Sequence, residues 1–366
     1  TSHNYVNKPV TFQTFCEDPY FLGETLTKGH WPLWKELGNV IYPHPCFSPY
    51  YELVLETPIG SAKCVKEGTR ISTSKGLIPI EQIQVGDLVQ TETKLKPVTK
   101  LWDNGVKNTQ VITTYSGKTI ECTDLHRLRV LDSTGNIVWK TAKDLEINDL
   151  LITQLKDHAI SDNSLETGLA YFLGILSGDG CITKNSKHSL RNNIGLSVGS
   201  TTFETEFVFI DTVKSLFETF LKGFSISKNR TVYTFRKSST SFGEFLLKEG
   251  FYVSEDIYLK RVPECIFRSC KKDILSYLSG LIDTDGYVSS NDIEISFKDH
   301  VFAEQVQILF SALGCYSRIT KHTEKKYNAK YTKLIVLKKE SFINLEGLDL
   351  KISYKNIAFN RLLNSI

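Results

Sequence analysis

The sequence predicts a multi-domain protein with an all-β domain over residues 64–157, an α+β domain over residues 158–340 and a partial α/β segment over residues 1–63. Two observations carry this prediction. From Cys64 onward, strand-like runs are separated by Gly, Asp and Asn. Further along, one order of helix and strand patterns occurs twice. Because 366 residues exceed what a single hydrophobic core usually serves, several domains are expected.

The all-β prediction depends on short runs spaced about 8 to 12 residues apart, which is typical of sandwiches and barrels. The runs are RISTSKG, IEQIQVGDLVQT, KPVTKLWDNG, NTQVITTYSGKTIECT and HRLRVLDSTGNIVWKT.

The α+β prediction depends on an internal repeat. An apolar helix that stops at Asp-Gly, a strand pair, a second helix and a second strand pair follow one another, and the order then recurs. Position 285 minus position 179 gives an offset of 106 residues between the two Asp-Gly sites. Long repeats of this kind indicate two similar subdomains related by a pseudo-twofold axis. Residues 341–366 have no clear counterpart in the first repeat and are predicted to be a separate C-terminal tail.

Composition excludes little. A net charge of +3 neither demands nor excludes nucleic acid, since binding depends on how charge is clustered. There is no secretory signal and no apolar run that could span a membrane, so we expect a cytoplasmic protein of a virus or its host cell. The eight cysteines form no CxxC pair, which disfavours zinc and a disulfide framework. The absence of Met indicates a fragment or a processed piece.

The two acidic helix ends are the first candidate site. Small residues would let the two helices approach closely and place Asp179 and Asp285 side by side. These small residues are Gly174, Ser177 and Gly178, matched by Ser279, Gly280 and Thr284. Paired carboxylates beside a phosphate suit Mg²⁺, which can assist phosphodiester cleavage. The alternative is that each Asp-Gly is only a helix C-cap.

The helices LAYFLGILSGDG and LSYLSGLIDTDG resemble the paired motifs of LAGLIDADG homing endonucleases. The first departs from the motif at Ser177, where an acid is usual, but it keeps Asp179. The resemblance implies an αββαββα fold in each half, four-stranded sheets that form a saddle over double-stranded DNA, and Mg²⁺-dependent cleavage with Asp179 and Asp285 as metal-binding catalytic acids. YLKRVPECI resembles the segment that carries a basic active-site residue in this family, which points to Lys260. The alternative for Lys260 is a solvated lysine in a strand or turn.

Basic residues in the predicted sheets are candidate DNA contacts, because alternate Lys and Arg would present one basic face to phosphates. In the first half they are Lys184, Lys187, Arg191, Lys228, Arg230, Arg236 and Lys237. In the second half they are Lys298, Arg318, Lys321, Lys325, Lys326, Lys330 and Lys333.

Cys64 begins a second motif set. CVKEGTRI and GKTIECTDLHRL resemble the first two splicing blocks of inteins, with Thr123 and His126 in the Thr-x-x-His places. LIPIEQIQVGDLV and WKTAKDLEINDLLI resemble further segments of the horseshoe-shaped Hint (Hedgehog/intein) fold. Attack by the Cys64 thiolate on the Lys63 carbonyl would form a thioester. His126 could protonate the departing nitrogen, and Thr123 could orient the peptide. Taken singly, Cys64 and His126 would be packed core residues.

The closing elements of an intein are not found, since the chain ends in LNSI without a His-Asn pair. The prediction is therefore the N-terminal part of a split or truncated intein, completed by a C-terminal intein fragment in trans, with a nested homing endonuclease. Two alternatives stay open. One is a catalytically decayed DNA-binding insertion, and the other is a Hedgehog-like autoprocessing domain without splicing.

Residues 1–63 would be the host segment, or N-extein. YYELVLETPIGSAK looks like a strand leading into a phosphate-binding loop that ends at Lys63, although Ala62 and Thr57 replace the usual glycines. With PYFLGETLTKGHWPLWKE upstream, the segment resembles the N-terminal region of phage terminase large subunits.

Overall fold

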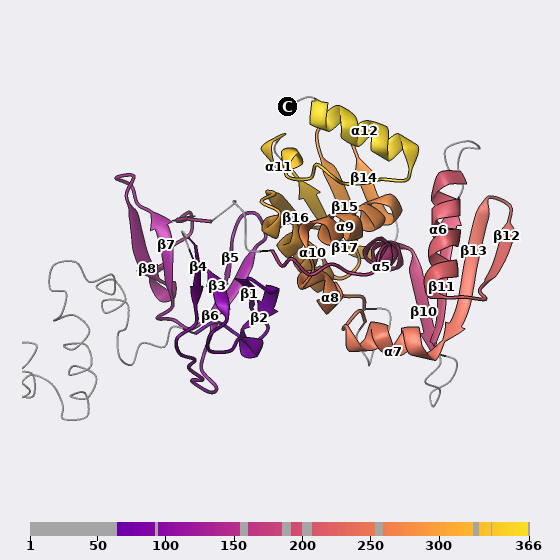
Figure 1. Ribbon diagram of the computed structural model, residues 1–366. Coiled ribbons are helices and arrows are strands. Elements are labelled where there is room, and N and C mark those ends of the chain that lie inside the picture. The colour runs from indigo at the N-terminus through magenta and orange to yellow at the C-terminus, as the bar shows by residue number, and fades with distance from the viewer. Residues whose placement is uncertain are drawn as a thin grey trace, which may run out of the picture. The chain divides into compact units, whose positions relative to one another are not determined.

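The computed structural model describes residues 64–91, 94–153, 160–184, 192–199, 207–252, 259–324, 329–337 and 339–364. The predicted host segment, residues 1–63, lies outside them. We call residues 64–153 the β-rich region and residues 160–364 the repeat region (Figure 1).

The β-rich region contains nine strands and, within its described residues, no α-helix. One sheet has the order β2-β1-β3-β4, a second is the hairpin β5-β6, and the third has the order β8-β7-β9. The bounds are β1 (Arg70–Thr73), β2 (Gly76–Pro79), β3 (Leu88–Gln90), β4 (Leu95–Pro97), β5 (Gln110–Thr113), β6 (Thr119–Cys122), β7 (Arg127–Leu131), β8 (Ile137–Thr141) and β9 (Leu150–Leu151). The all-β prediction for this region is confirmed at the level of its strands.

The prediction of a strand over KPVTKLWDNG is mostly wrong. Strand β4 ends at Pro97, and residues 98–109 form no strand. The side chain of Asp103 accepts a hydrogen bond from the Gly105 amide at 2.8 Å, which offers the backbone a local turn instead of a ladder.

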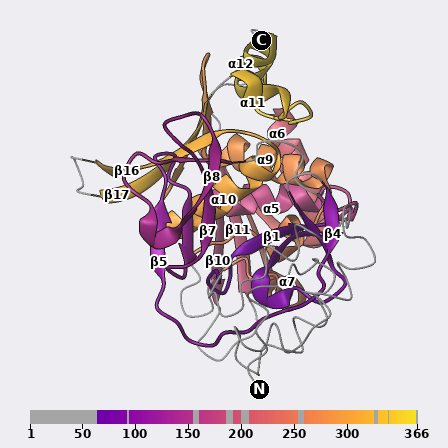
Figure 2. The ribbon, with the colours of Figure 1, turned by 90° about the vertical axis from the view of Figure 1, so that its left-hand side faces the viewer.

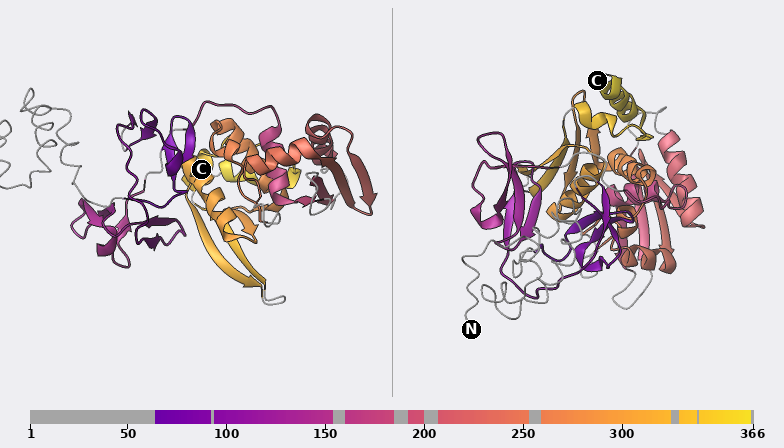
Figure 3. Two further views of the ribbon diagram at one scale, coloured as in Figure 1. Left: turned by 90° about the horizontal axis from the view of Figure 1, so that it is seen from below. Right: turned by 60° about the vertical axis from the view of Figure 1, so that its left-hand side comes forward.

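The repeat region shows the predicted order in both halves. The first half contains α5 (Leu169–Gly178), β10 (Gly180–Lys184), β11 (Asn192–Gly199), α6 (Phe207–Phe220), β12 (Ser225–Asn229), β13 (Val232–Ser239) and α7 (Thr240–Lys248). The second contains α9 (Lys271–Asp285), β14 (Gly286–Val288), β15 (Ile293–Phe297), α10 (His300–Ala312), β16 (Ser317–Glu324) and β17 (Ala329–Val336), preceded by α8 (Glu264–Phe267). The sheets have matching antiparallel orders, β10-β11-β13-β12 and β14-β15-β17-β16. Hairpin β16–β17 is the long pair of strands in Figure 3, left.

The hydrophobic core lies in the repeat region. Helices α5 and α9 pack side by side at its centre (Figure 2), and their buried residues are almost continuous from Ala170 to Ser177 and from Ile274 to Asp283. Such all-round burial is expected of a central helix, in contrast to the one-sided pattern of α6.

The predicted C-terminal tail is part of this core. Its described helices are α11 (Lys339–Ile343) and α12 (Ser353–Asn364). Phe342, Leu345, Phe359 and Leu362 are at most 2 % exposed and belong to the same buried cluster as α5 and α9. The compact unit therefore continues past position 340, because these apolar side chains find their burial against the second half.

Candidate functional site

Asp179 and Asp285 lie at the adjoining C-terminal ends of α5 and α9. Glycines set the approach of the two helices. A Cβ on Gly174 would lie 2.1 Å from the Tyr277 carbonyl oxygen, and one on Gly280 would lie 2.4 Å from that of Tyr171. Only glycine fits at such distances, so the backbones touch and the helix ends meet. The predicted packing through small residues is confirmed.

Burial and neighbouring charges shift the pKa values of both carboxylates. Burial and, to a smaller extent, the Asp179 charge raise the pKa of Asp285 to about 6 against the opposing effect of Lys260 and Lys355, although both carboxylate side chains still reach solvent. Burial also raises the pKa of Asp179, while Lys260 and Lys355 lower it. Two acids at negative helix ends need compensating positive charge nearby.

Lys260 lies at the end of α5. Its Nζ donates to the carbonyl oxygens of Ser177 at 3.0 Å and Gly178 at 2.5 Å. Burial lowers the pKa of Lys260 to about 8, whereas Asp285 and Asp179 act in the opposite direction. The alternative of a solvated lysine is wrong, because its ammonium group neutralises the carbonyls that end the helix.

Lys355, which the sequence analysis did not single out, holds the equivalent place on α9. Its Nζ donates to the carbonyl oxygens of Ile282 and Asp283, both at 2.8 Å, and the residue is 4 % exposed. Burial lowers the pKa of Lys355, while Asp283, Asp179 and Asp285 raise it. The one available signal was a lysine in the first turn of a helix within residues 341–366, which is too common to indicate a site.

A crossed pair of hydrogen bonds joins the helices two residues before each acid. The Tyr171 hydroxyl donates to Asp283 at 2.6 Å, and the Tyr277 hydroxyl lies 2.9 Å from Ser177 Oγ. Both pairs keep the 106-residue offset found in the sequence. Ser177 therefore fills the structural place of the missing motif acid, as a hydrogen-bond partner of a tyrosine.

The donors suit a hard divalent cation. Two carboxylates converge at the helix ends, and within the described part of the chain no cluster of three or more His, Cys, Asp or Glu side chains could hold a metal ion. Mg²⁺ takes few protein oxygens and completes its shell with water and phosphate. Two aspartates fit that requirement, and they do not fit zinc, which prefers His and Cys.

The sheets divide the predicted basic residues between two faces. In the first sheet Phe235 is buried toward the helices, so Lys237, two positions on, and Lys228, opposite Tyr233, share its face. Arg236 points to the open face. In the second sheet Ile319 and Leu334 are buried, so Arg318 and Lys333 lie on the opposite face. There the Arg318 guanidinium lies 4.1 Å from the centre of the Tyr115 ring, and Lys333 pairs with Glu294 at 2.8 Å.

The prediction of one basic face from all these residues is wrong for that reason, since neighbouring strand positions alternate. Lys237 instead donates to the Gly223 carbonyl oxygen at 3.2 Å. Lys321 and Lys330 share the register of the buried face and are exposed near the far end of the hairpin. Arg230 lies in the turn between β12 and β13, and Lys298 follows β15. Lys187, Arg191, Lys325, Lys326 and the side chain of Lys184 lie outside the described residues.

The second candidate site brings Cys64 and Thr123 together. The Cys64 amide donates to Thr123 Oγ1 at 3.2 Å, and the Thr123 amide donates to the Cys64 carbonyl oxygen at 3.0 Å. The His126 amide donates to the Thr123 carbonyl oxygen at 2.9 Å, so His126 lies on the same turn. Asn104, which the sequence analysis did not single out, donates from Nδ2 to Cys64 Sγ at 2.8 Å. Lys63 lies outside the described residues.

Residues 272–346 match the family model described as a LAGLIDADG-like domain. The match falls within the second repeat. It contains α9 with Asp285 and the sheet β14-β15-β17-β16, whereas Lys260 and Lys355 lie on either side of the match.

Curated relatives match over part of the chain. The alpha subunit NrdEB of a ribonucleoside-diphosphate reductase from Bacillus subtilis is 28% identical over 225 residues, which is 58% of this chain and 20% of that protein. A probable translation initiation factor IF-2 from Methanocaldococcus jannaschii is 26% identical over 208 residues, which is 53% of this chain and 16% of that protein. The chain thus spans about a fifth of these relatives' length or less.

Solved structures are similar at low overall scores. A mesophilic variant of the homing endonuclease I-DmoI is 20% identical, covers 49% of this chain and 93% of its own, and has a TM-score of 0.36. The homing endonuclease I-WcaI bound to its DNA recognition sequence is 15% identical, covers 53% and 87%, and has a TM-score of 0.34. No helix in the part of the chain that the structure describes is long and apolar enough to span a bilayer.

Proposed function

We propose that the repeat region, residues 160–364, is a homing endonuclease that hydrolyses one phosphodiester bond in each strand of double-stranded DNA, with Mg²⁺ as its cofactor. The observation that carries this proposal is the meeting of Asp179 and Asp285 at two touching helix ends, each with a lysine ammonium group bonded to its last carbonyl oxygens. Perturbed acids and amines gathered at one point are typical of a catalytic centre rather than of two helix caps. The LAGLIDADG-like domain at residues 272–346 supports the same reaction class.

Each group has a task in such a reaction. Asp179 and Asp285 would bind the metal through carboxylate oxygens. A bound Mg²⁺ would supply Lewis-acid stabilisation of phosphate and acidify water. The ammonium groups of Lys260 and Lys355 would offset the carboxylate charge and stabilise negative charge on the phosphate.

The pseudo-twofold arrangement suits the substrate. The two strands of a DNA duplex are themselves related by local twofold symmetry, so one helix end can serve each strand. Arg236 is exposed on the first sheet and could contact phosphates, whereas Arg318 and Lys333 would first have to leave Tyr115 and Glu294. Among the other described candidates, Arg230 in its turn and Lys321 and Lys330 near the far end of their hairpin are exposed and could also contact phosphates.

The test is cleavage of a supercoiled plasmid library that carries randomised inserts, in Mg²⁺, with recovery of linear molecules. We expect recurring insert sequences from the wild-type chain. Asp285→Asn should reduce linearisation by about two to three orders of magnitude, the range typical of losing one preorganised catalytic group. Asp292→Asn, a change at a turn of the same half, should cleave normally. Sequence-specific binding of the inserts without cleavage in any metal would instead support the decayed DNA-binding alternative.

A second activity is favoured by the contacts of Cys64. We propose that the β-rich region is the N-terminal splicing part of an intein, in which the Cys64 sulfur attacks the Lys63 carbonyl carbon. The carbon–sulfur bond forms, the carbon–nitrogen bond breaks, and the nitrogen leaves as an amine with a proton supplied through His126. The hydrogen bond between the Cys64 amide and Thr123 Oγ1 orients that nitrogen.

The relatives support an inserted element. A reductase subunit and a translation initiation factor have unrelated activities by name, yet each shares with this chain a segment that is a small part of its own length. A segment common to unrelated proteins is expected when one mobile element has entered several genes. The terminase-like host, the C-terminal intein fragment and the cytoplasmic location stay predictions.

Intact mass with and without a small thiol tests the thioester. We expect a thiol-dependent break between Lys63 and Cys64 in wild type, none in Cys64→Ala, and an unchanged break in Cys181→Ala, which removes another accessible thiol. If no break occurs even after a C-terminal intein fragment is added, the splicing proposal is wrong. Release of residues 1–63 to water or sterol-like nucleophiles without any partner polypeptide would support the Hedgehog-like alternative.

A further inference from the structure

We infer that Arg70, a residue of the β-rich region, is a positioning residue for the endonuclease reaction, because it fixes the segment that carries Lys260. This inference rests on the proposed DNA cleavage for its role in the reaction, but the placement of Lys260 can be measured without DNA.

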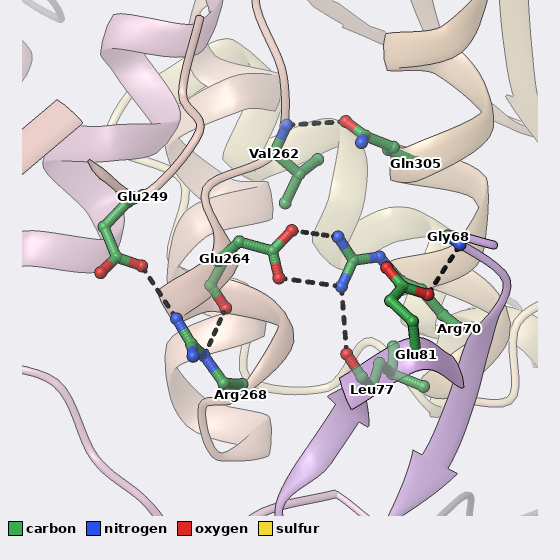
Figure 4. A network of polar contacts seen from close by, with 9 residues as sticks. All are labelled: Gly68, Arg70, Leu77, Glu81, Glu249, Val262, Glu264, Arg268 and Gln305. Carbon is green, nitrogen blue, oxygen red and sulfur yellow. Dashed lines mark hydrogen bonds and ion pairs between the residues drawn. The ribbon is translucent and has the colours of Figure 1, made fainter. Parts of the chain in front are cut away.

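Arg70 contacts Glu264 and Phe267 in the repeat region and Leu77 in its own hairpin. Its guanidinium forms a two-pronged ion pair with Glu264, the first residue of α8, and one prong, Nη1 to Oε2, measures 3.1 Å. The same Nη1 donates to the Leu77 carbonyl oxygen at 3.1 Å, and the guanidinium carbon lies 3.4 Å from the centre of the buried Phe267 ring. Figure 4 shows the Arg70 guanidinium between the Glu264 carboxylate and the Leu77 carbonyl. The Arg70 side chain is only 8 % exposed.

The hairpin around Arg70 also touches α8 through its backbone. A Cβ on Gly76 would lie 2.4 Å from the Phe267 carbonyl oxygen and 2.7 Å from Arg268 Cα. Leu77 is buried and joins the same hydrophobic cluster as α5 and α9. The contact is therefore close-packed, and α8 cannot shift without moving the hairpin.

From α8 the chain leads directly back to Lys260. Pro263, whose ring fixes φ at −60°, precedes Glu264, and the Val262 amide donates to Gln305 Oε1 at 2.9 Å. On the other side of the helix start, the Glu264 amide donates to the Glu249 carbonyl oxygen at 2.8 Å. Only three residues separate Glu264 from Lys260, so a displacement of α8 reaches the lysine.

A bidentate arginine is suited to this task. Two parallel hydrogen bonds to one carboxylate and a ring stacked on the guanidinium allow only one orientation of the planar group. The pair therefore fixes both the distance and the direction between the two side chains. A pair kept only for stability would gain little over apolar packing, since charges lose solvation when they are buried. The geometry assigns to Arg70 the orientation of α8 and, through it, of the Lys260 ammonium group at the end of α5.

The first test uses hydrogen–deuterium exchange in the whole chain. Arg70→Met keeps the aliphatic contact with Phe267 and removes the fork. The double variant Arg70→Met/Glu264→Gln avoids a lone carboxylate if the single variant folds poorly. Lys75→Met is the matched control, since Lys75 lies in the same hairpin turn and pairs with Asp87 on the exposed side.

We expect the amides of Val262, Glu264 and Ile266 to exchange about tenfold faster in the Arg70 variants and at the wild-type rate in Lys75→Met. Unchanged exchange of these amides in a folded Arg70 variant would overturn the inference, whether or not the protein cleaves DNA.

The second test follows the two strands of a plasmid that wild type linearises. Lys260 lies at one of the two helix ends. A misplaced Lys260 should therefore slow cleavage of one DNA strand by about ten- to a hundredfold, and nicked circular plasmid should accumulate. Arg70→Met and Lys260→Met should nick the same strand, and Arg70→Lys should restore only part of the rate. Equal slowing of both strands would show a general loss of folded enzyme and reject positioning. If wild type cleaves no insert at all, the proposed function fails, and the exchange experiment alone decides the placement.

Discussion

The two acidic helix ends of the repeat region look alike in sequence but are held in place differently. At the end of α9, Asp283 accepts from the Tyr171 hydroxyl and from the backbone amides of Lys351 and Ile352 at 2.8 and 3.2 Å. At the end of α5, the Ser177 hydroxyl is hydrogen-bonded to the Tyr277 hydroxyl and donates to the Leu173 carbonyl oxygen. Asp283 thus fixes the end of α9 to residues 351 and 352, which lie far along the chain. The equivalent side chain on α5, Ser177, bonds to its own helix and to Tyr277. The two halves therefore share the aspartate and the contact between the helices, but the lysine at each helix end comes from a different part of the chain.

The largest expected effect concerns the two lysines. Lys260→Met and Lys355→Met should each reduce cleavage of one strand by about 100- to 1,000-fold, because each removes the cation at one helix end. If the halves are functionally equivalent, the two variants should nick opposite strands. Strand-specific end labels on a linear substrate measure this. Nicking of the same strand by both variants would show that the helix ends do not serve separate strands.

The next effect separates Asp283 from Ser177 in stability. Asp283→Ala removes the acceptor for one hydroxyl and two backbone amides and should lower the free energy of unfolding by about 3 kcal/mol, since each buried donor left unpaired costs about 1 kcal/mol or more. Ser177→Ala removes one small hydroxyl and should cost about 1 kcal/mol. Urea unfolding by circular dichroism measures both. Equal losses would mean that the amides of residues 351 and 352 find other partners at no cost.

The smallest effect is the pH dependence of stability without metal. Asp285 has a raised pKa of about 6 in the folded protein and 3.8 as its ordinary value, so the folded state holds the extra proton between these values. Its contribution is therefore fully present below about pH 4 and is lost as pH rises through 6. Asp285→Asn should gain thermal stability relative to wild type above pH 6 in a chelator, and the gap should close toward pH 4. A difference between the two melting temperatures that stays constant across this range would contradict the raised pKa.

Periodicity and spacing predicted most of the fold. The order of helices and strands in both repeats, the 106-residue offset and the close packing through Gly174 and Gly280 all follow from patterns of apolar and small residues. The meeting of Asp179 and Asp285 was predictable because the packing of two repeated helices constrains it, whereas Lys260 was suggested only by the resemblance of YLKRVPECI to a segment of a known family. Cys64 and Thr123 were placed together by an ordered set of motifs, and the structure has them hydrogen-bonded.

What the sequence could not predict depends on long-range packing. Lys355 reaches the site from a helix 70 positions after Asp285, and no local pattern connects the two. The pairing of Arg70 with Glu264 joins residues 194 positions apart. The faces of Lys228 and Lys237 were mispredicted because strand register, which decides the side of a sheet, becomes visible only when the strands are paired.

The place of Lys355 in the chain has a consequence for synthesis on the ribosome. Lys355 follows Asp285 by 70 residues, and a chain grows at about 5–20 residues per second, so the carboxylates precede their second lysine by about 4–14 seconds. During that interval the carbonyl oxygens at the end of α9 lack the Lys355 ammonium group, and the Asp283 carboxylate lacks the amides of residues 351 and 352. A nascent chain therefore carries both acids of the proposed nuclease before it carries a complete site. For the proposed nuclease, the order of translation would delay cleavage of DNA until the segment that carries Lys355 has docked.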